Sequence, residues 1–134
     1  MIAASDGVAL ARAFFVLAAV ESTAQRAPGT SDAECTHFEQ AAAQTADILS
    51  SQLTQAQDTL LTDIINFQIE LLADDAYYGA IIRRIRAGGS AEDAVRVVTE
   101  DTCGELQGMQ DNTYLQARTA DIQDIGNRLL AQLN

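Results

Sequence analysis

The stretch YLQARTADIQDIGNRLL, residues 114–130, decides the fold because its apolar residues recur at alternating steps of three and four. This spacing predicts a helix that packs through a single stripe. One cation interrupts the stripe, and acidic side chains lie beside it. With its continuation past residue 130, the stripe consists of Leu115, Arg118, Ile122, Ile125, Leu129 and Leu133.

Charged pairs run along the same helix. Arg118 and Asp121 are three residues apart, and Asp124 and Arg128 are four apart, which are the spacings at which helical side chains meet. The pairs could simply brace the helix. Arg118 lies on the packing stripe, however, and burying a guanidinium is costly unless it is paired or the stripe opens there. Gly126, in mid-helix, indicates that something else approaches the backbone closely.

Further segments with helical spacing precede this helix. They are expected over residues 31–57, 60–72, 77–85 and 90–109. Ser90 and Asp93 form a capping box, and the adjacent glycines of AGGS supply the stop before it. Four principal helices joined by short turns predict an all-α fold, a bundle of two helical hairpins.

The only proline marks a boundary. It lies in RAPGTSD, residues 26–32, and its Pro-Gly turn separates residues 1–26 from a helical domain over residues 31–134. The N-terminal part contains GVALARAFFVL, which is rich in residues that favour strands and is also tolerable as helix. An unpaired strand there could drive homodimerisation.

Composition and charge narrow the class of partner. The chain has 134 residues, 48% of them hydrophobic, and a formal net charge of −11. This charge opposes binding to nucleic acid or anionic lipid and favours a basic protein partner. No apolar run reaches the roughly 20 residues that a membrane-spanning helix needs.

The inventory of reactive residues is small. His37 is the only histidine and has no serine or cysteine nucleophile at helical spacing, so we expect a solvated helix-face residue. Cys35 and Cys103 do not form a zinc motif, and we expect them to be reduced. AGGSAED resembles a phosphate loop only weakly, since the chain contains no lysine. We therefore expect no catalytic residue, no metal site and no cofactor.

The roles of two polar features, one on the second helix and one just after it, remain open. Gln68 falls on the apolar stripe, so its amide must either be hydrogen-bonded in the core or lie where the stripe meets a partner. Asp74 and Asp75 are adjacent, so their side chains diverge and cannot act as an acid and base pair. One of them is expected to cap the next helix, and together they form an acidic surface.

The last helix resembles a known family. YLQARTADIQDIGNRLL is similar to the segment YL-x-x-R-x-x-D-[IV]-x-D-I-x-x-R-[LV]-L that closes the helical subdomain of enzyme I, the phosphoenolpyruvate-protein phosphotransferase of the bacterial sugar phosphotransferase system. ASDGVALARA resembles the first strand of that family, and IELLADD resembles a helix-ending segment. A related possibility is the enzyme I-like part of the phosphotransfer subunit that serves dihydroxyacetone kinase.

The resemblance implies a docking role in the cytoplasm. In the family, two helical hairpins are inserted after the first strand of a phosphohistidine domain and bind the small phosphocarrier HPr through an acidic and apolar surface. Asp121 and Asp124 would face the phosphohistidine domain. The HPr-binding residues implied here are Ile64, Gln68, Leu71, Asp74, Asp75, Leu115 and Arg118.

Departures from the family pattern limit what the chain does alone. The G-G-x-x-S-H context of the phosphorylated histidine is absent, and so is the phosphoenolpyruvate-binding barrel. The chain is therefore expected to dock a carrier without performing the transfer. Phe67 stands where a small residue is common, and Gln68 where histidine is frequent, so both bear on which carrier is bound.

A rival interpretation comes from another class of protein. AFFVLAAV followed by ESTAQ resembles a secretory signal, with cleavage near Ala24. The mature chain would then be a secreted or periplasmic helical bundle, an interaction protein with a disulfide between Cys35 and Cys103.

Overall fold

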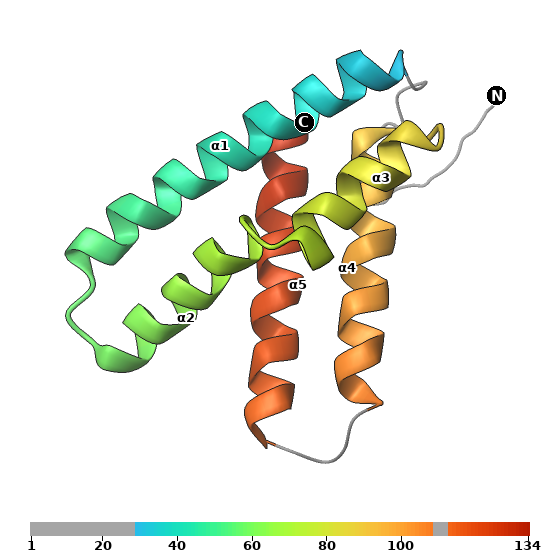
Figure 1. Ribbon diagram of the computed structural model, residues 1–134. Helices are drawn as coiled ribbons and strands as arrows, with labels where there is room; N and C mark the ends of the chain where they lie inside the picture. The colour runs from blue at the N-terminus through green and yellow to red at the C-terminus, as the bar shows by residue number, and fades with distance from the viewer. Residues whose placement is uncertain (1–28, 109–112) are drawn as a thin grey trace, which may run out of the picture.

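The computed structural model describes residues 29–108 and 113–134, and the secondary structure of these residues is helices joined by turns, with no strand. The chain folds into two helical hairpins that cross (Figure 1). The prediction of an all-α bundle of two hairpins is confirmed. In chain order the elements are α1 (Ser31–Gln55), α2 (Thr59–Leu71), a π-helical turn η1 (Asp75–Gly79), α3 (Ala80–Arg86), α4 (Ala91–Gln107) and α5 (Thr113–Leu133).

Side-chain caps fix where the helices of the first hairpin begin. The Thr30 hydroxyl accepts from the Ala33 amide, and the Asp58 carboxylate accepts from the Leu60 amide. Each cap satisfies one of the amides that a helix start leaves without a partner. Helix α1 ends at Gln55, two residues before the expected end, because Ala56 already has an extended backbone.

A turn of irregular helix separates α2 from α3. Asp74 caps it by accepting from the Ala76 amide, which decides between the two aspartates that the sequence left open. Asp75 instead pairs with Arg83 at 3.2 Å. The buried Tyr77 ring begins the next apolar face, and Gly88, with a φ of 118°, ends α3 in the left-handed region that glycine adopts without strain.

The capping box of α4 forms as predicted. The Ser90 hydroxyl accepts from the Asp93 amide at 3.1 Å. A carboxylate from α1 also reaches this helix start, since Glu34 Oε1 accepts from the Ala91 amide at 2.8 Å. Its other oxygen accepts from the Gly29 amide. Glu34 therefore ties the start of the described chain to both hairpins.

The core lies where the hairpins cross. Helices α4 and α5 run side by side as the second hairpin, and α1 passes across their upper end (Figure 1). Ile125 and Leu129 of α5 are completely buried, and burying a side chain of this size contributes roughly 1.5–3 kcal/mol. Most of the predicted stripes are buried. The first turn of α2 is an exception, since Leu60 and Leu61 are 65% and 44% exposed.

Several expectations concern residues that the structure does not describe. The N-terminal strand, the boundary near residue 26 and dimerisation through residues 1–26 lie outside the described residues. Within the described residues, no helix is long and apolar enough to span a membrane.

The two cysteines are free and buried. The Cys103 thiol donates to the Thr119 backbone oxygen at 3.7 Å, and burial raises its pKa. The disulfide that the secreted-bundle interpretation requires is not formed.

Candidate docking site

A buried amide joins α2 to α5. Gln68 is only 2% exposed, and its Nε2 donates to the backbone oxygen of Asp121 and to the Asp124 carboxylate, both at 3.0 Å. Since a buried polar group must find such partners, these bonds answer the question that the sequence left open. Gln68 is satisfied inside the interface between the helices, and it fixes how α5 lies on α2.

The pKa values of the two aspartates at this junction are shifted in opposite directions. Burial by itself would raise the pKa of Asp124, but the hydrogen bonds from Gln68 and Arg128 and the Arg128 charge lower it below the usual range. For Asp121, burial raises the pKa, the Arg118 charge opposes this shift, and the Asp124 charge adds to it. Asp124 is therefore the more strongly ionised member of the pair.

Arg118 is held from three sides. Its guanidinium carbon lies 5.0 Å from the centre of the Phe67 ring and 4.9 Å from that of the Tyr114 ring. Its Nη1 donates to Asp121 Oδ2 at 3.0 Å, and the two side chains of this ion pair are only 14% and 12% exposed. Ring stacking and ion pairing together compensate for the cost of placing a cation on a packing stripe.

Beside this cation, α2 and α5 line an open pocket of about 320 Å³. We call it the α2/α5 pocket. Two of its six lining residues are acidic, one carries an amide, and two are aromatic. It is lined by Asp63, Asn66, Phe67, Glu70, Tyr114 and Arg118.

The structure distributes the residues predicted to bind a carrier over several environments. Ile64 and Leu115 are half-buried, and Leu71 is buried with Gln68. Asp74 and Asp75 are exposed beyond the end of α2. Ile64, Leu115 and the two aspartates are thus at least partly accessible, whereas Gln68 and Leu71 are buried. Binding of a carrier to these residues stays a prediction.

Asp121 and Asp124 are brought together as their spacing predicts. Each forms its expected ion pair, Asp121 with Arg118 and Asp124 with Arg128 at 2.9 Å. Both lie on the side of α5 that contacts Gln68 of α2. Their contact with a phosphohistidine domain stays a prediction.

Sequence reasoning missed most of the pocket. Asp63, Asn66, Phe67 and Glu70 follow one another at steps of three, one and three, which places them on one face of α2. That spacing could have identified the α2 side of the pocket from the sequence. What the pattern could not show is that Tyr114, 61% exposed, would close the other side of the pocket from α5.

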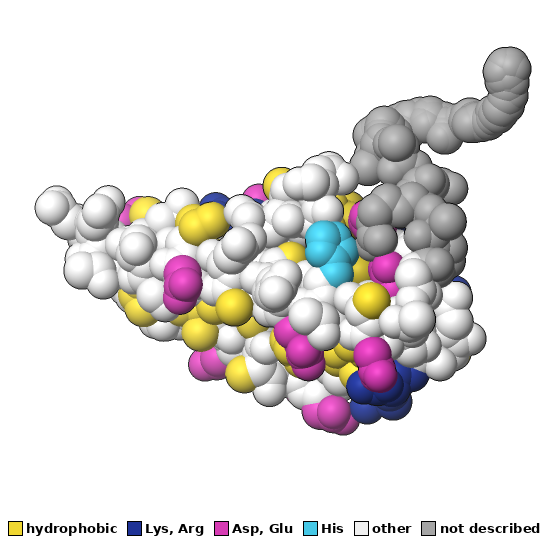
Figure 2. All heavy atoms as spheres, turned by 90° about the horizontal axis from the view of Figure 1, so that it is seen from above, with side chains coloured by type: hydrophobic (Ala, Val, Ile, Leu, Met, Phe, Trp, Pro, Cys, Tyr) yellow, Lys and Arg dark blue, Asp and Glu magenta, His cyan; other side chains and the backbone are white. Residues whose placement is uncertain are grey.

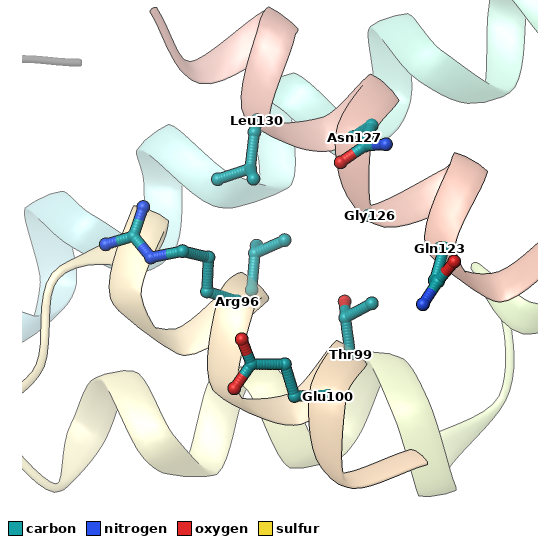
Figure 3. A pocket seen from close by; sticks show the side chains of 8 residues that line it. Arg96, Thr99, Glu100, Gln123, Gly126, Asn127 and Leu130 are labelled. Atoms are coloured by element: carbon teal, nitrogen blue, oxygen red, sulfur yellow. The ribbon is translucent and has the colours of Figure 1, made fainter. Parts of the chain in front are cut away.

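A second pocket, of about 310 Å³, lies between α4 and α5 (Figure 3). Gly126 forms part of its wall, and a Cβ there would lie 2.8 Å from the Thr99 side chain, so the predicted close approach is made by Thr99. The Thr99 hydroxyl bonds with the buried Tyr77 hydroxyl at 2.8 Å, and burial raises the pKa of Tyr77 to about 12. The hydrogen bond between Thr99 and Tyr77 therefore helps to hold α4 against the turn that precedes α3.

His37 is more enclosed than expected. Its ring is half-buried, and Nε2 donates to the Leu133 backbone oxygen at 3.0 Å, which joins the end of α5 to α1. Within the described ranges, no group of three or more histidine, cysteine or acidic residues could hold a metal ion.

Acidic side chains are spread over the face that carries α1, and basic ones gather at one edge of it (Figure 2). Only six arginines fall within the described residues, and four of them are paired with aspartates. The described part of the chain therefore carries an excess of negative charge at its surface.

Comparison with known proteins gives a consistent result. Residues 2–118 match the family model described as "PEP-utilising enzyme, N-terminal". The phosphoenolpyruvate-protein phosphotransferase of Enterococcus faecalis is 33% identical over 136 residues, covering 98% of this chain and 24% of that protein. The corresponding protein of Streptococcus equinus is 34% identical with the same coverage. This chain therefore spans about a quarter of the length of these relatives.

A solved structure has the same fold. The solution NMR structure of an enzyme I protein (nEIt) superimposes with a TM-score of 0.69 over 77% of this chain and 43% of that chain, at 21% sequence identity.

Proposed function

This chain belongs to the PEP-utilising enzyme N-terminal family, and on that premise we propose that it is the docking part of an enzyme I-type phosphotransferase. It binds a small basic phosphocarrier, HPr or an HPr-like domain, in the cytoplasm. The phosphohistidine domain of the parent enzyme is its second partner and carries the reacting histidine. The system served is the sugar phosphotransferase system.

One observation carries this proposal: exposed apolar and acidic side chains occur together along α2 and at the start of α5. Leu60, Leu61 and Tyr114 are among the large hydrophobic side chains that stay exposed to solvent. Asp63 and Glu70 are exposed on the same helix as the two leucines. Apolar contact area with charges around it is the usual composition of a protein interface, and the negative charge selects a basic partner.

The contribution of such a unit to phosphoryl transfer is proximity and orientation. Two histidines on separate proteins react efficiently only when they are held close together and aligned. The junction made by Gln68 and the stacked Arg118 is suited to this role, because it makes the surface of α2 and α5 rigid before a carrier arrives.

Titration of the isotope-labelled chain with unphosphorylated HPr of Enterococcus faecalis tests the proposal. We expect NMR chemical-shift changes over residues 60–75 and at Tyr114 and Leu115, with affinity that falls as salt is added. A control titration uses an acidic protein of similar size, for which no shifts are expected. Shifts confined to α1, or no binding of HPr at low ionic strength, would reject the proposed function.

A further inference from the structure

We propose that the pocket between α4 and α5 binds a free α-amino acid with an apolar side chain, leucine being the simplest example. This inference goes beyond carrier docking. The α5 residues of the pocket, Gln123, Gly126, Asn127 and Leu130, lie on the opposite side of that helix from Asp121 and Asp124, as a helix of 3.6 residues per turn requires. The pocket is therefore separate from the junction with α2.

The floor of the pocket is apolar and narrow. Gly126 contributes no side chain to it, and the buried Val95 and Thr99 of α4 face this glycine. Leu130, which is half-buried, adds apolar surface from α5 (Figure 3). The volume of about 310 Å³ suits one small molecule and is too small for a helix. An aliphatic side chain fits this floor.

Two opposite charges stand beside the floor without a partner. Arg96 and Glu100 are one turn apart on α4, and Figure 3 shows their side chains extending in the same direction. Within residues 29–108 and 113–134 neither of them forms an ion pair. Their spacing would allow a pair, but arginine before glutamate is the weaker order on a helix. Both charges are therefore available to a ligand.

Two carboxamides lie across the pocket from these charges. Gln123 and Asn127 are one turn apart on α5 and face α4 (Figure 3). In the described part of the chain, neither side chain takes part in a hydrogen bond. A carboxamide donates through its nitrogen and accepts through its oxygen, so it can serve a carboxylate or an ammonium group. The polar groups around the floor thus offer both donors and acceptors.

The charges select a ligand that is neutral overall. Glu100 and the formal net charge of −11 oppose a simple anion, and Arg96 opposes a simple cation. An amino acid carries a carboxylate and an ammonium group on the same carbon. Its carboxylate would accept from Arg96, its ammonium group would donate to Glu100, and its side chain would cover Val95 and Leu130. No single-charged ligand uses both groups.

An NMR titration of the isotope-labelled full chain tests the site with four compounds. Leucine has all three groups, N-acetyl-leucine lacks the ammonium group, leucine amide lacks the carboxylate, and glycine lacks the apolar side chain. The side-chain amides of Gln123 and Asn127 and the backbone amide of Gly126 report binding. We expect leucine to shift them at millimolar concentrations and the other compounds to bind at least about threefold more weakly. Tyr77 should also respond to leucine, because its hydroxyl bonds with that of Thr99 at 2.8 Å.

Variants of the full chain locate the recognition. Affinity for leucine is compared in R96Q, in E100Q and in two controls, R84Q on α3 and E105Q on α4, which each remove one exposed charge away from the pocket. R96Q and E100Q should bind leucine roughly tenfold more weakly, and the controls should stay within about twofold of wild type. Since neither pocket charge has an ion-pair partner among the described residues, both variants should keep the wild-type circular dichroism spectrum.

Each alternative outcome overturns a stated part of the inference. If leucine causes no shifts at its solubility limit, the amino-acid site is wrong. If N-acetyl-leucine or leucine amide binds as well as leucine, recognition of both charges is wrong, and if glycine does, the apolar floor plays no part. Wild-type affinity in both R96Q and E100Q would reject the assigned pocket. HPr enters none of these measurements, so a failure of the docking function leaves them unaffected.

Discussion

Gln68 on α2 donates its side-chain amide to the backbone oxygen of Asp121 on α5 at 3.0 Å, from a position that is 2% exposed. The same nitrogen reaches the Asp124 carboxylate. A residue whose position predicted either a core or an interface role therefore belongs to the contact between the two hairpins. The rigidity of the proposed docking surface depends on this contact.

Replacing Gln68 by leucine should destabilise the fold. The substitution keeps the volume but leaves the Asp124 carboxylate and the Asp121 carbonyl without this donor, which costs about 1–3 kcal/mol. Urea unfolding measures the change. Gln52, exposed on α1, is the control, and its replacement by leucine should change the free energy of unfolding by less than about 0.5 kcal/mol. Equal effects at both positions would show that the amide bonds contribute nothing.

Arg118 should matter more than an exposed arginine. Arg118→Ala removes the ion pair with Asp121 and both ring contacts, and it leaves a mostly buried carboxylate without its cation. We expect a loss of roughly 2–4 kcal/mol in the free energy of unfolding. Arg118→Lys should recover part of it, because lysine keeps the charge without the planar stack. Arg84→Ala, on the exposed side of α3, should be nearly neutral, and a similar loss there would contradict the assigned role.

Two glycines within helices should respond in opposite directions to alanine. At Gly126 an added Cβ would lie 2.8 Å from both Thr99 Oγ1 and Cγ2, so Thr99 must move and its bond with Tyr77 is strained. Gly126→Ala should therefore destabilise by about 1–2 kcal/mol despite better helix propensity. Gly104 on α4 has open space around it, and Gly104→Ala should stabilise by up to about 1 kcal/mol. Thermal unfolding of both variants checks the pair, and the same sign at both sites would refute the packing argument.

The pKa values of the two aspartates at the α2–α5 junction should lie on opposite sides of 3.8, the ordinary value for an aspartate. The pKa of Asp124 is lowered, so its contribution to stability is fully present above 3.8 and is lost as the pH falls toward the lower folded value. The pKa of Asp121 is raised, so its contribution is present below 3.8 and is lost as the pH rises through the folded value. Carbon-13 titration of the two carboxyl groups should give the order Asp124 below Asp121.

Acid unfolding of Asn variants provides an independent check of these signs. In D124N the loss of stability relative to wild type should shrink as the pH is lowered from 6 to 3, because the wild-type carboxylate is being protonated. In D121N the difference should move the other way. The reverse order in both experiments would mean that Gln68 and Arg128 do not favour the ionised form of Asp124.

Features that depend on neighbours along the chain were predictable from the sequence. The capping box at Ser90 and Asp93, the left-handed stop at Gly88 and the ion pairs along α5 involve residues within four positions of one another. Helical spacing identified the buried stripe through Ile122, Ile125, Leu129 and Leu133, and hence the all-α class. These predictions succeeded because local hydrogen bonds and helical periodicity depend on residues close together in the sequence and not on how the helices pack.

Only the tertiary structure decided how those helices meet. It buried Gln68, exposed Leu60 and Leu61, and placed Tyr114 against Phe67 across the guanidinium of Arg118. None of these outcomes is encoded in one helix, because the crossing of the hairpins determines which side chains share a space. The sequence determined the elements and their negative charge, and the packing of α2 against α5 determined where that charge forms a pocket.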